Sequence, residues 1–328
     1  MATIVDVTVI IVNHNAGEYL AKCLAALAAQ TVAPKRVVVV DNASTDGSLA
    51  ELETRYPCVY LIKSQENLGF AAANNLAVAT AVETDWIALL NPDAFPEPDW
   101  LEAFQNTALA NPEYSFFCCR MLKADDPTAL DGAGDSYHVS GLAWRKFHGC
   151  KALGNAMRQQ EVFAPCAAAA LYRRAAFVEA GGFDEAYFCY MEDVDLAYRL
   201  RLLGHRCLYV PSAVVHHVGS GIVGRRSDFA TYHGHRNLVW TYVKNMPGFL
   251  FWLYLPQHVL INIASIIWLG LRGQGRVILT AKRDALRQLP RVWRQRRSIQ
   301  ENRRVSAGKL RQVMDKGFSV FAMCRCGF

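Results

Sequence analysis

The chain of 328 residues is 52% hydrophobic and 20% charged, a composition that supports a sizeable folded core and excludes extended disorder and collagen-like repetition. Its net charge of +6 is uneven: residues 272–328 hold 15 Lys and Arg against 3 Asp and Glu, whereas residues 1–271 hold 20 against 26. The ten cysteines form no C-x-x-C pairs at zinc spacing, which favours reduced thiols in a cytosolic protein.

Strand and helix patterns alternate along the first 97 residues. The apolar run that begins at Val7 carries Asp6 and no basic leader, so it predicts a buried first strand rather than a signal peptide. The valines at 37–40 are typical of a strand covered on both faces. This alternation predicts an α/β fold with a mostly parallel sheet and helices on both faces. The expected strands are 7–13, 36–41, 58–63 and 85–90, and the expected helices are 17–29, 46–55 and 69–80.

The pattern loosens after Pro98. A turn-rich stretch near 123–165 comes first, and helical periodicity then returns, with Gly204 as the stop of the second helix. We therefore expect a nucleotide-binding half at 1–97 and an acceptor half at 98–244. The two later helices are expected at 174–180 and 193–203.

Polar residues follow each of the four expected strands. Any one of them is by itself more often a helix cap or turn residue, but the carboxyl ends of parallel strands share one edge, where ligands bind. Asp41 is suited to accept from the ring N–H of a pyrimidine, while Asn67 and the small Gly69 allow a helix start to approach a diphosphate. The four segments are 13–15, 41–47, 67–69 and 91–93.

Asp93 has a different chemistry. A hard cation prefers oxygen ligands, and a departing diphosphate needs its charge neutralised. The sequence therefore predicts a divalent cation, Mg²⁺ or Mn²⁺, at Asp93.

Several short motifs occur in a characteristic order. They resemble those of family 2 glycosyltransferases, in particular the rhamnosyltransferase-like branch, over residues 5–245. The motifs are Val9-Ile10-Ile11-Val12-Asn13-His14-Asn15, Val40-Asp41-Asn42-Ala43-Ser44-Thr45-Asp46-Gly47, Asn67-Leu68-Gly69-Phe70-Ala71, Leu90-Asn91-Pro92-Asp93, Gly181-Gly182-Phe183-Asp184-Glu185, Tyr190-Met191-Glu192-Asp193-Val194-Asp195-Leu196, Val215-His216-His217 and Arg236-Asn237.

The resemblance implies a GT-A fold that binds a nucleoside-diphosphate sugar, with dTDP-rhamnose as a donor candidate, and transfers the sugar with inversion. By resemblance, Asp41 contacts the base, Asp93 ends the D-x-D metal motif, Asp193 is the catalytic base and His216 reaches the metal or the diphosphate. The predicted donor-binding residues are Asn13, Asn15, Asp41, Asn67, Gly69, Asn74 and Asn91.

Two positions depart from the family pattern. Asn91 stands where the D-x-D motif begins, which removes one charge from the metal site and puts the metal affinity in doubt. Residues 166–168 read Cys-Ala-Ala where relatives often have glycine, a difference expected to alter the acceptor pocket.

Helix spacing bears on the choice of base. Arg199 lies four residues after Asp195, so that pair is expected to form a surface salt bridge. Asp193 has no such partner, and near a helix N-terminus it is expected to stay ionised and accept a proton from a sugar hydroxyl. Glu192 remains the alternative base.

Residues 219–224 spell G-x-G-x-x-G, but no apolar-periodic helix follows them. This is a poor dinucleotide fingerprint. The alternatives are a mobile loop that brings Arg225 or Arg226 near the diphosphate and an ordinary surface loop.

The C-terminal part, 245–328, begins with an uncharged stretch at 245–271. As a helix, its apolar portion is long enough to cross a bilayer, but one crossing would place the basic tail opposite a catalytic lobe that needs cytosolic nucleotide sugars. An in-plane or re-entrant segment at the cytoplasmic membrane face fits better. Apolar residues at helical spacing then predict an interfacial helix on anionic lipid. They are Ile278, Ala281, Ala285, Leu289 and Val292.

The sequence thus predicts a glycosyltransferase that acts on a lipid-linked or glycan acceptor in the synthesis of cell-surface polysaccharide. Two alternatives are a nucleotidyltransferase, for which no P-loop is present, and a non-catalytic membrane scaffold, against which Asp41, Asp93 and Asp193 argue. No recognisable nucleic-acid-binding module accompanies the basic tail, so we expect no nucleic-acid partner.

Overall fold

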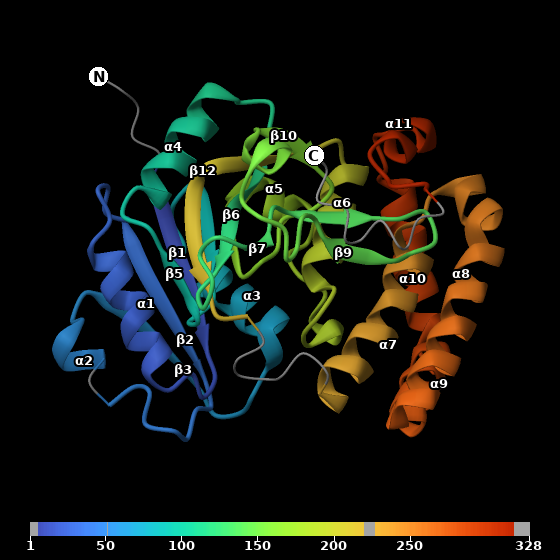
Figure 1. Cartoon of the computed structure of the whole chain (residues 1–328), viewed down its shortest axis with the longest axis horizontal. Helices are drawn as coiled ribbons and strands as arrows, with labels where there is room; N and C mark the ends of the chain where they lie inside the picture. Colours follow the sequence, from blue (N-terminus) through green and yellow to red (C-terminus); the bar gives the residue numbers. More distant parts are fainter. Residues whose placement is uncertain (1–5, 51, 220–226, 318–328) are drawn as a thin grey trace.

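The computed structural model describes residues 6–50, 52–219 and 227–317. A central mixed sheet is covered by helices on both faces, and four C-terminal helices flank it on one side (Figure 1). The strands are β1 (Val7–Asn13), β2 (Arg36–Asn42), β3 (Val59–Ser64), β4 (Trp86–Leu90), β5 (Ala94–Pro96), β6 (Phe116–Lys123), β7 (Leu130–Gly132), β8 (Asp135–Tyr137), β9 (Ala143–Arg145), β10 (Gln160–Val162), β11 (Ala169–Arg173) and β12 (Cys207–His217). The helices are α1 (Glu18–Ala28), α2 (Leu52–Arg55), α3 (Gly69–Ala81), α4 (Trp100–Ala110), α5 (Arg174–Glu179), α6 (Glu192–Leu202), α7 (Asp228–Asn245), α8 (Gly248–Leu269), α9 (Gly275–Arg287), α10 (Leu289–Glu301) and α11 (Ala307–Gln312), with short turns η1 (Gly154–Met157), η2 (Glu185–Tyr187) and η3 (Gly270–Gln274).

The main path of the sheet runs β10-β12-β6-β11-β4-β1-β2-β3. Strands β4, β1, β2 and β3 are parallel to one another, and β12 is parallel to β6, while β11 and β10 are antiparallel to their neighbours. The predicted mostly parallel sheet is therefore confirmed. Because β1 to β4 run in the same direction, the polar segments that follow them lie at one edge of the sheet.

One expected helix is much shorter than predicted. Within the described residues, only Leu52–Arg55 of the expected helix 46–55 is helical. Asp46 explains the loss, because its carboxylate accepts from the backbone N–H of Ser48 at 3.0 Å and from that of Gly17 at 2.7 Å. Such local hydrogen bonds satisfy the backbone without a helix.

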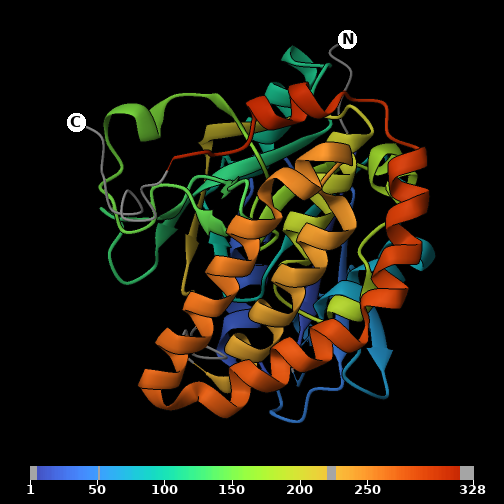
Figure 2. The same cartoon turned by 90° about the vertical axis from the view of Figure 1, so that its right-hand side faces the viewer.

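Helices α7 to α10 form a layer beside the sheet (Figure 2). The layer is part of the main hydrophobic core, since Leu250, Ala285 and Val292 are fully buried there together with residues of β1 and β2. The backbone carbonyl of Ala285 accepts from the Trp240 indole at 3.1 Å. The domain boundary predicted after residue 244 thus falls at the end of α7, although α7 and α8 both contribute to the same hydrophobic core.

The predicted interfacial face of the basic tail is wrong. Ile278, Ala281, Ala285 and Val292 are fully buried against the rest of the protein, because α9 and α10 pack on α7. The exposed apolar residues of these two helices are Leu279, Leu286 and Trp293.

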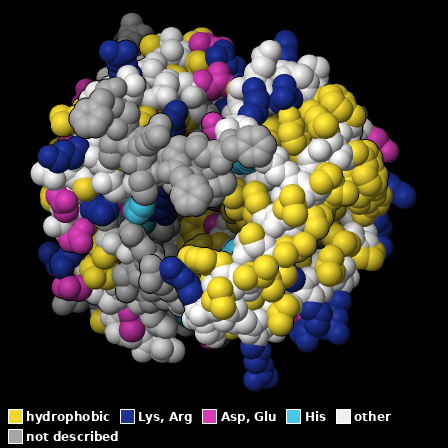
Figure 3. Space-filling view, turned by 45° about the vertical axis from the view of Figure 1, so that its right-hand side comes forward, with side chains coloured by type: hydrophobic (Ala, Val, Ile, Leu, Met, Phe, Trp, Pro, Cys, Tyr) yellow, Lys and Arg dark blue, Asp and Glu magenta, His cyan; other side chains and the backbone are white. Residues whose placement is uncertain are grey.

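Helix α8 carries the larger exposed apolar face (Figure 3). It is the start of the one segment among the described residues, Gly248–Arg287, that is long and apolar enough to cross a membrane by length and composition. Its buried residues are spread along its length, at Leu250, Phe251, His258 and Leu269. Helix α8 therefore lies along the domain from end to end. Its exposed apolar side chains are Phe249, Trp252, Leu253, Val259, Leu260, Ile263, Ile267 and Trp268.

The cysteines agree only in part with the expectation of reduced thiols. Seven of those described are free, and most of them are buried. Cys150 is disulfide-bonded.

Candidate active site

Asn13 and Asp41 meet where β1 and β2 end. They are register partners, with Asn13 Nδ2 3.3 Å from Asp41 Oδ1. The same amide nitrogen lies 3.0 Å from Ser44 Oγ and 2.9 Å from Ser48 Oγ. Both Asn13 and Asp41 are buried, yet Asn13 Oδ1 has no hydrogen-bond partner among the described residues. A buried acceptor without a donor is costly, so this oxygen marks a place for a donor from a ligand.

Asn15 is exposed and braces the loop after β2. Its backbone N–H donates to Ser44 Oγ at 3.1 Å, and its Oδ1 accepts from the backbone N–H of Thr45 at 2.8 Å. Asn15 has a φ of 53°, in the left-handed region that asparagine tolerates better than most residues. Asn15 therefore fixes the backbone of this loop at the edge of the sheet where β1 and β2 end.

The segment Asn67–Gly69 is tied to Asn42, a residue that the sequence interpretation did not single out. Asn42 Nδ2 donates to Asn67 Oδ1 at 2.8 Å, and Asn42 Oδ1 accepts from the N–H of Leu68 at 2.8 Å. Gly69 has a φ of +79°, and a Cβ there would lie 2.6 Å from the ring of Phe188. Position 69 thus requires glycine because the ring of Phe188 packs on it. The predicted approach of a diphosphate to Gly69 stays a prediction.

Asn74 lies one turn inside α3, away from the strand ends. It is buried, and its Nδ2 donates to the carbonyl of Phe70 at 2.8 Å. Its neighbour Asn75 makes the longer-range contacts: its amide exchanges hydrogen bonds with the backbone of Phe183 in both directions, each at 2.9 Å. Asn75 therefore holds the Gly-Gly-Phe-Asp-Glu segment against α3.

Asp93 is buried and lies beside His217 rather than His216. His217 is the register partner of Ala94, which places its Nε2 3.4 Å from Asp93 Oδ1. His216 Nε2 instead lies 3.0 Å from Glu97 Oε1. Consecutive strand residues point to opposite faces, so only one of the two histidines can reach Asp93. The histidine that contacts Asp93 is therefore His217, whereas the predicted reach of His216 to a metal or diphosphate stays a prediction.

A buried charged network extends from His217, and sequence reasoning missed it. His217 Nδ1 lies 2.8 Å from Asp131 Oδ2, and Arg145 forms an ion pair with the same carboxylate. Burial raises the pKa of Asp131, but the hydrogen bond from His217 and the charge of Arg145 outweigh it and lower that pKa to about 2. Burial and the nearby charge of Asp193 raise the pKa of Asp135 to about 7. Asp131, Asp135 and Arg145 come from the short strands of a stretch expected only to be turn-rich.

Arg145 and Asp135 also line a cavity of about 430 Å³ that contains both candidate bases and Asn91. Cys166, Ala167 and Ala168, the segment that departs from the family pattern, form part of its wall. The lining residues are Phe70, Asn91, Asp135, Ala143, Trp144, Arg145, Cys166, Ala167, Ala168, Cys189, Tyr190, Met191, Glu192, Asp193, Val194 and Gly234.

Asp193 forms no ion pair among the residues the structure describes. Its Oδ2 accepts from the N–H of Ala167 at 3.2 Å, and its Oδ1 accepts from that of Val194 at 2.8 Å. Burial nevertheless raises the pKa of Asp193, despite these hydrogen bonds and the charge of Arg145, which lower it. Sequence reasoning considered only the helix N-terminus, which favours the ionised form, and did not foresee this burial. The raised pKa makes the Asp193 carboxylate more basic than usual, which suits a general base.

Glu192 lies on the buried side of the helix start. It is 5% exposed, and its Oε2 has no hydrogen-bond partner within the described part of the chain. Burial and the charge of Asp193 raise the pKa of Glu192 well above its usual value. Two backbone N–H groups and the charge of Arg145 favour the ionised form of Asp193, so the geometry favours Asp193 as the proton acceptor.

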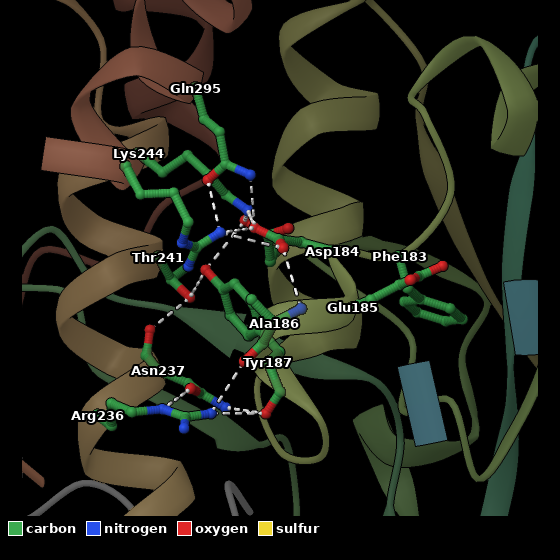
Figure 4. A network of polar contacts seen from close by, with 12 residues as sticks. Phe183, Asp184, Glu185, Ala186, Tyr187, Arg236, Asn237, Thr241, Lys244 and Gln295 are labelled. Atoms are coloured by element: carbon green, nitrogen blue, oxygen red, sulfur yellow. Dashed lines mark hydrogen bonds and ion pairs between the residues drawn. The ribbon is translucent and has the colours of Figure 1, made fainter. Parts of the chain in front are cut away.

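The expectation of a surface salt bridge at Asp195 is wrong. Asp195 is fully buried and pairs with Arg199 at 2.9 Å and with Lys244 at 2.8 Å. Lys244 is 1% exposed and also contacts Asp184 at 2.8 Å (Figure 4). Asp184 belongs to the Gly-Gly-Phe-Asp-Glu segment and Asp195 to α6. The buried Lys244 therefore joins both of these segments to α7.

Asn237 and Arg236 hold the turn that precedes α6 (Figure 4). Asn237 Nδ2 lies 3.0 Å from the carbonyl of Tyr187 and 2.7 Å from that of Tyr190. Tyr190 and Met191 have φ values of 67° and 68°, a left-handed backbone that costs energy for side chains of their size. The hydrogen bonds from α7 maintain this conformation, which sets where α6 begins at Glu192 and so positions Asp193 in its first turn.

The predicted loop residues Arg225 and Arg226 lie outside the described residues, as does most of the G-x-G-x-x-G segment.

Comparison with known proteins now identifies the family. The family model for glycosyl transferase family 2 matches residues 8–181, which is more than half of the chain. The chain belongs to glycosyltransferase family 2. An N-acetylglucosaminyl-diphospho-decaprenol L-rhamnosyltransferase of Mycobacterium tuberculosis is 32% identical over 69% of this chain and 80% of its own length. The O-antigen chain rhamnosyltransferase RfbN of Salmonella typhimurium is 28% identical over 64% of this chain and 66% of its own.

Solved structures support the GT-A fold of this glycosyltransferase. The mannosyltransferase PcManGT from Pyrobaculum calidifontis, in complex with GDP-Man and Mn²⁺, covers 96% of this chain and 89% of its own, with a TM-score of 0.55 and 19% identity. GalNAc-T7 with UDP, GalNAc and Mn²⁺ covers 74% of this chain and 48% of its own, with a TM-score of 0.60 and 15% identity. The enzyme thus belongs to the rhamnosyltransferase-like branch on its sequence and to the GT-A class on its fold.

Proposed function

We propose that this glycosyltransferase moves a sugar from a nucleoside-diphosphate sugar to a lipid-linked or glycan acceptor with inversion at the anomeric carbon. In this reaction the acceptor oxygen forms a bond to the anomeric carbon as the bond to the diphosphate oxygen breaks, and the hydroxyl proton passes to Asp193. The observation that carries the proposal is the Asp193 carboxylate, which faces the cavity without an ion-pair partner among the described residues and with a raised pKa. Attack opposite the leaving group inverts the anomeric centre.

The donor would lie across the strand ends. Asp41 and Asn13 would meet the base, where Asn13 Oδ1 lacks a partner within the described residues, and Asn15 and Asn67 would fix the neighbouring loops. Asn91 lines the cavity between this edge and Asp193. We propose dTDP-rhamnose as the first donor to test, because the relatives named above are rhamnosyltransferases.

Asp93 and His217 would hold a divalent cation. One carboxylate oxygen and one imidazole nitrogen, 3.4 Å apart and buried, would be the protein's ligands. No group of three or more His, Cys, Asp or Glu side chains that could hold a metal occurs among the described residues, so the substrate's phosphates and water would have to supply the other ligands. Such a cation, when bound, neutralises charge on the departing diphosphate. Asp131, which is itself paired with Arg145, orients His217 through its other ring nitrogen.

We also propose that the enzyme lies on the cytoplasmic face of a membrane through α8. The exposed face of this helix is apolar, with Trp252 and Trp268 toward its two ends, and exposed arginines of α9 and α10 lie nearby to meet anionic lipid. Because the opposite face of α8 contacts the domain along its length, an in-plane position suits it better than a crossing.

The first experiment measures binding and slow hydrolysis of a panel of nucleotide sugars, with and without Mn²⁺ or Mg²⁺. We expect one donor to bind in a metal-dependent way, and we expect Asp93→Ala to abolish that dependence while Asp99→Ala, an exposed aspartate nearby, retains it. The glycoside product should have the anomeric configuration opposite to that of the donor. Failure of every nucleotide sugar to bind would refute the donor assignment.

Fractionation tests the membrane location separately. A protein held by an apolar face and basic residues should stay partly bound after a high-salt wash and be released by carbonate. A fully soluble protein would refute this part of the proposal.

A further inference from the structure

A second cavity adjoins the one that contains Asp193. It has a volume of about 1140 Å³ and lies between α7, the turn before β9, and the junction of α8 with η3. Four residues line both cavities, so the two are adjacent along a shared wall. The shared residues are Ala143, Tyr190, Met191 and Gly234.

The far side of this cavity reaches the exposed apolar face of α8. Trp268 and Leu269 line it at the end of that helix, and Arg272 follows in η3. Ile267 and Leu271, which adjoin these residues in the sequence, are 58% and 84% exposed. A molecule in this cavity would therefore lie between residues that also line the site of Asp193 and the end of the apolar helix α8.

Arg272 is the cation at this exit. Its guanidinium carbon lies 4.1 Å from the centroid of the Trp268 ring, which orients the group while leaving its N–H edge free to bind an anion. Among the described residues, no carboxylate forms an ion pair with Arg272. The carboxylate nearest to it in the lining, Asp228, accepts from Gln274 Nε2 at 3.0 Å. Tryptophan and arginine side chains are typical of the level at which lipid headgroups meet water.

His235 provides a second polar group inside the cavity. Its Nδ1 is buried and has no hydrogen-bond partner within the described residues. Burial and the charge of Lys282 lower the pKa of His235 to about 4, so at neutral pH it is an uncharged group that can donate or accept one hydrogen bond.

We propose that this cavity binds the phosphate-bearing headgroup of the lipid-linked acceptor, with Arg272 as its anion contact and the lipid chain lying along the exposed face of α8. The inference rests on the proposed function and deepens it, because it assigns the acceptor a route from the membrane to Asp193. The acceptor sugar would enter the smaller cavity past Gly234 and Met191, its phosphates would stay near Arg272, and its chain would remain in lipid.

The test compares two acceptors that carry the same sugar, one on a short prenyl diphosphate and one on a neutral short alkyl chain. Arg272→Gln should raise KM for the diphosphate acceptor about ten- to hundredfold, the effect of losing one charged hydrogen bond, and leave KM for the neutral acceptor and for the donor unchanged. Arg276→Gln is the matched control, because it removes an equally exposed arginine one turn away that does not line the cavity. Equal effects of Arg272→Gln on both acceptors, or an equal effect of Arg276→Gln, would overturn the proposal.

A blocking variant supplies a readout that needs no catalysis. A Cβ added at Gly234 meets nothing within 4 Å, so the position admits the start of a side chain, and Gly234→Phe adds a ring at the shared wall. Calorimetric titration with the sugar-bearing prenyl diphosphate should then show binding to the wild type and weakened binding to Gly234→Phe and Arg272→Gln, with unfolding temperatures maintained. Binding that both variants retain at wild-type strength overturns the site. Wild-type protein that binds this lipid but no nucleotide sugar would instead refute the proposed transferase reaction while supporting the site.

Discussion

Lys244 offers the sharpest test of how the segment from Asp184 to Asp195, which includes Asp193, is held in place. Its ammonium group contacts Asp184 and Asp195, each at 2.8 Å, and all three side chains are largely or fully buried. In Lys244→Met both carboxylates lose this partner, and breaking a buried ion pair typically costs about 3–5 kcal/mol. Because Arg199 and Arg291 still face the two carboxylates, we expect the lower value, about 3 kcal/mol.

The pH dependence of this loss has a definite sign. Burial raises the pKa of Asp184 and of Asp195, but Lys244 and the arginines outweigh it and hold both below the ordinary value of 3.8. The stability that these carboxylates contribute is therefore fully present above that value and is lost as the pH falls through their lower native pKa. The difference between wild type and Lys244→Met should be largest near pH 7 and shrink below about pH 4 as the carboxyls become protonated.

The assay is thermal and urea unfolding of the full chain. A loss of about 3 kcal/mol corresponds to a decrease in Tm of roughly 5–10 °C for a chain of this size. Lys22→Met is the matched control, because Lys22 pairs with Glu18 on the surface and should contribute only about 0.3–0.5 kcal/mol. Adding Asp184→Asn to Lys244→Met should restore part of the stability, since it removes one unpaired buried charge. Equal unfolding midpoints for the two lysine variants would refute the reasoning.

Four further outcomes follow from the site and the surface. Asp193→Asn should lower kcat by about 10²- to 10⁴-fold with donor affinity retained, as measured by single-turnover kinetics and donor titration. Wild-type kcat should fall as the pH drops through the raised pKa of Asp193, and Arg145→Gln should move this acid limb to higher pH; an unmoved limb would contradict the assigned base. Gly234→Ala should increase the free energy of unfolding by about 0.5–1 kcal/mol in urea titrations, because the glycine lies inside a helix and its added Cβ meets open space. Ile263→Asp should weaken co-sedimentation with anionic vesicles, whereas Leu109→Asp, at a similarly exposed position on α4, should leave it unchanged.

The edge of the sheet where Asn13 and Asp41 meet was predictable from the sequence, because its geometry follows from the direction of the strands. Parallel strands place residues such as Asn13 and Asp41 side by side whatever happens elsewhere in the chain, and the register confirms this pairing. The histidine beside Asp93 was harder to predict. His216 and His217 are adjacent in one strand, and a one-residue difference reverses the face to which a side chain points. The antiparallel pairing of β12 with β5 decides that His217, and not His216, lies beside Asp93.

Residues outside any periodic pattern could not be assigned a role from the sequence. Asp131 contacts His217 across 86 positions of sequence, and both Asp131 and Arg145 come from three-residue strands in a stretch with neither helical nor alternating periodicity. The one available signal was the occurrence of charged residues among otherwise apolar neighbours in that stretch. Lys244 was missed for a related reason, because a lysine near a helix end resembles a surface residue until its burial is known.

The C-terminal helices connect the exposed apolar face of α8 with the turn that precedes α6 and Asp193. Helix α8 presents the apolar face, while α10 contributes Arg296, which donates to the carbonyls of Val243 and Met246 at the end of α7. Helix α7 in turn holds the strained turn before Asp193 through Asn237. A chain cut after α7 would leave those carbonyls unpaired and the core residues of α9 and α10 without a partner. The apolar face of α8 and the position of Asp193 therefore depend on the same packed helices, so point substitutions on the outer face of α8, rather than truncation, can separate the proposed membrane and catalytic roles.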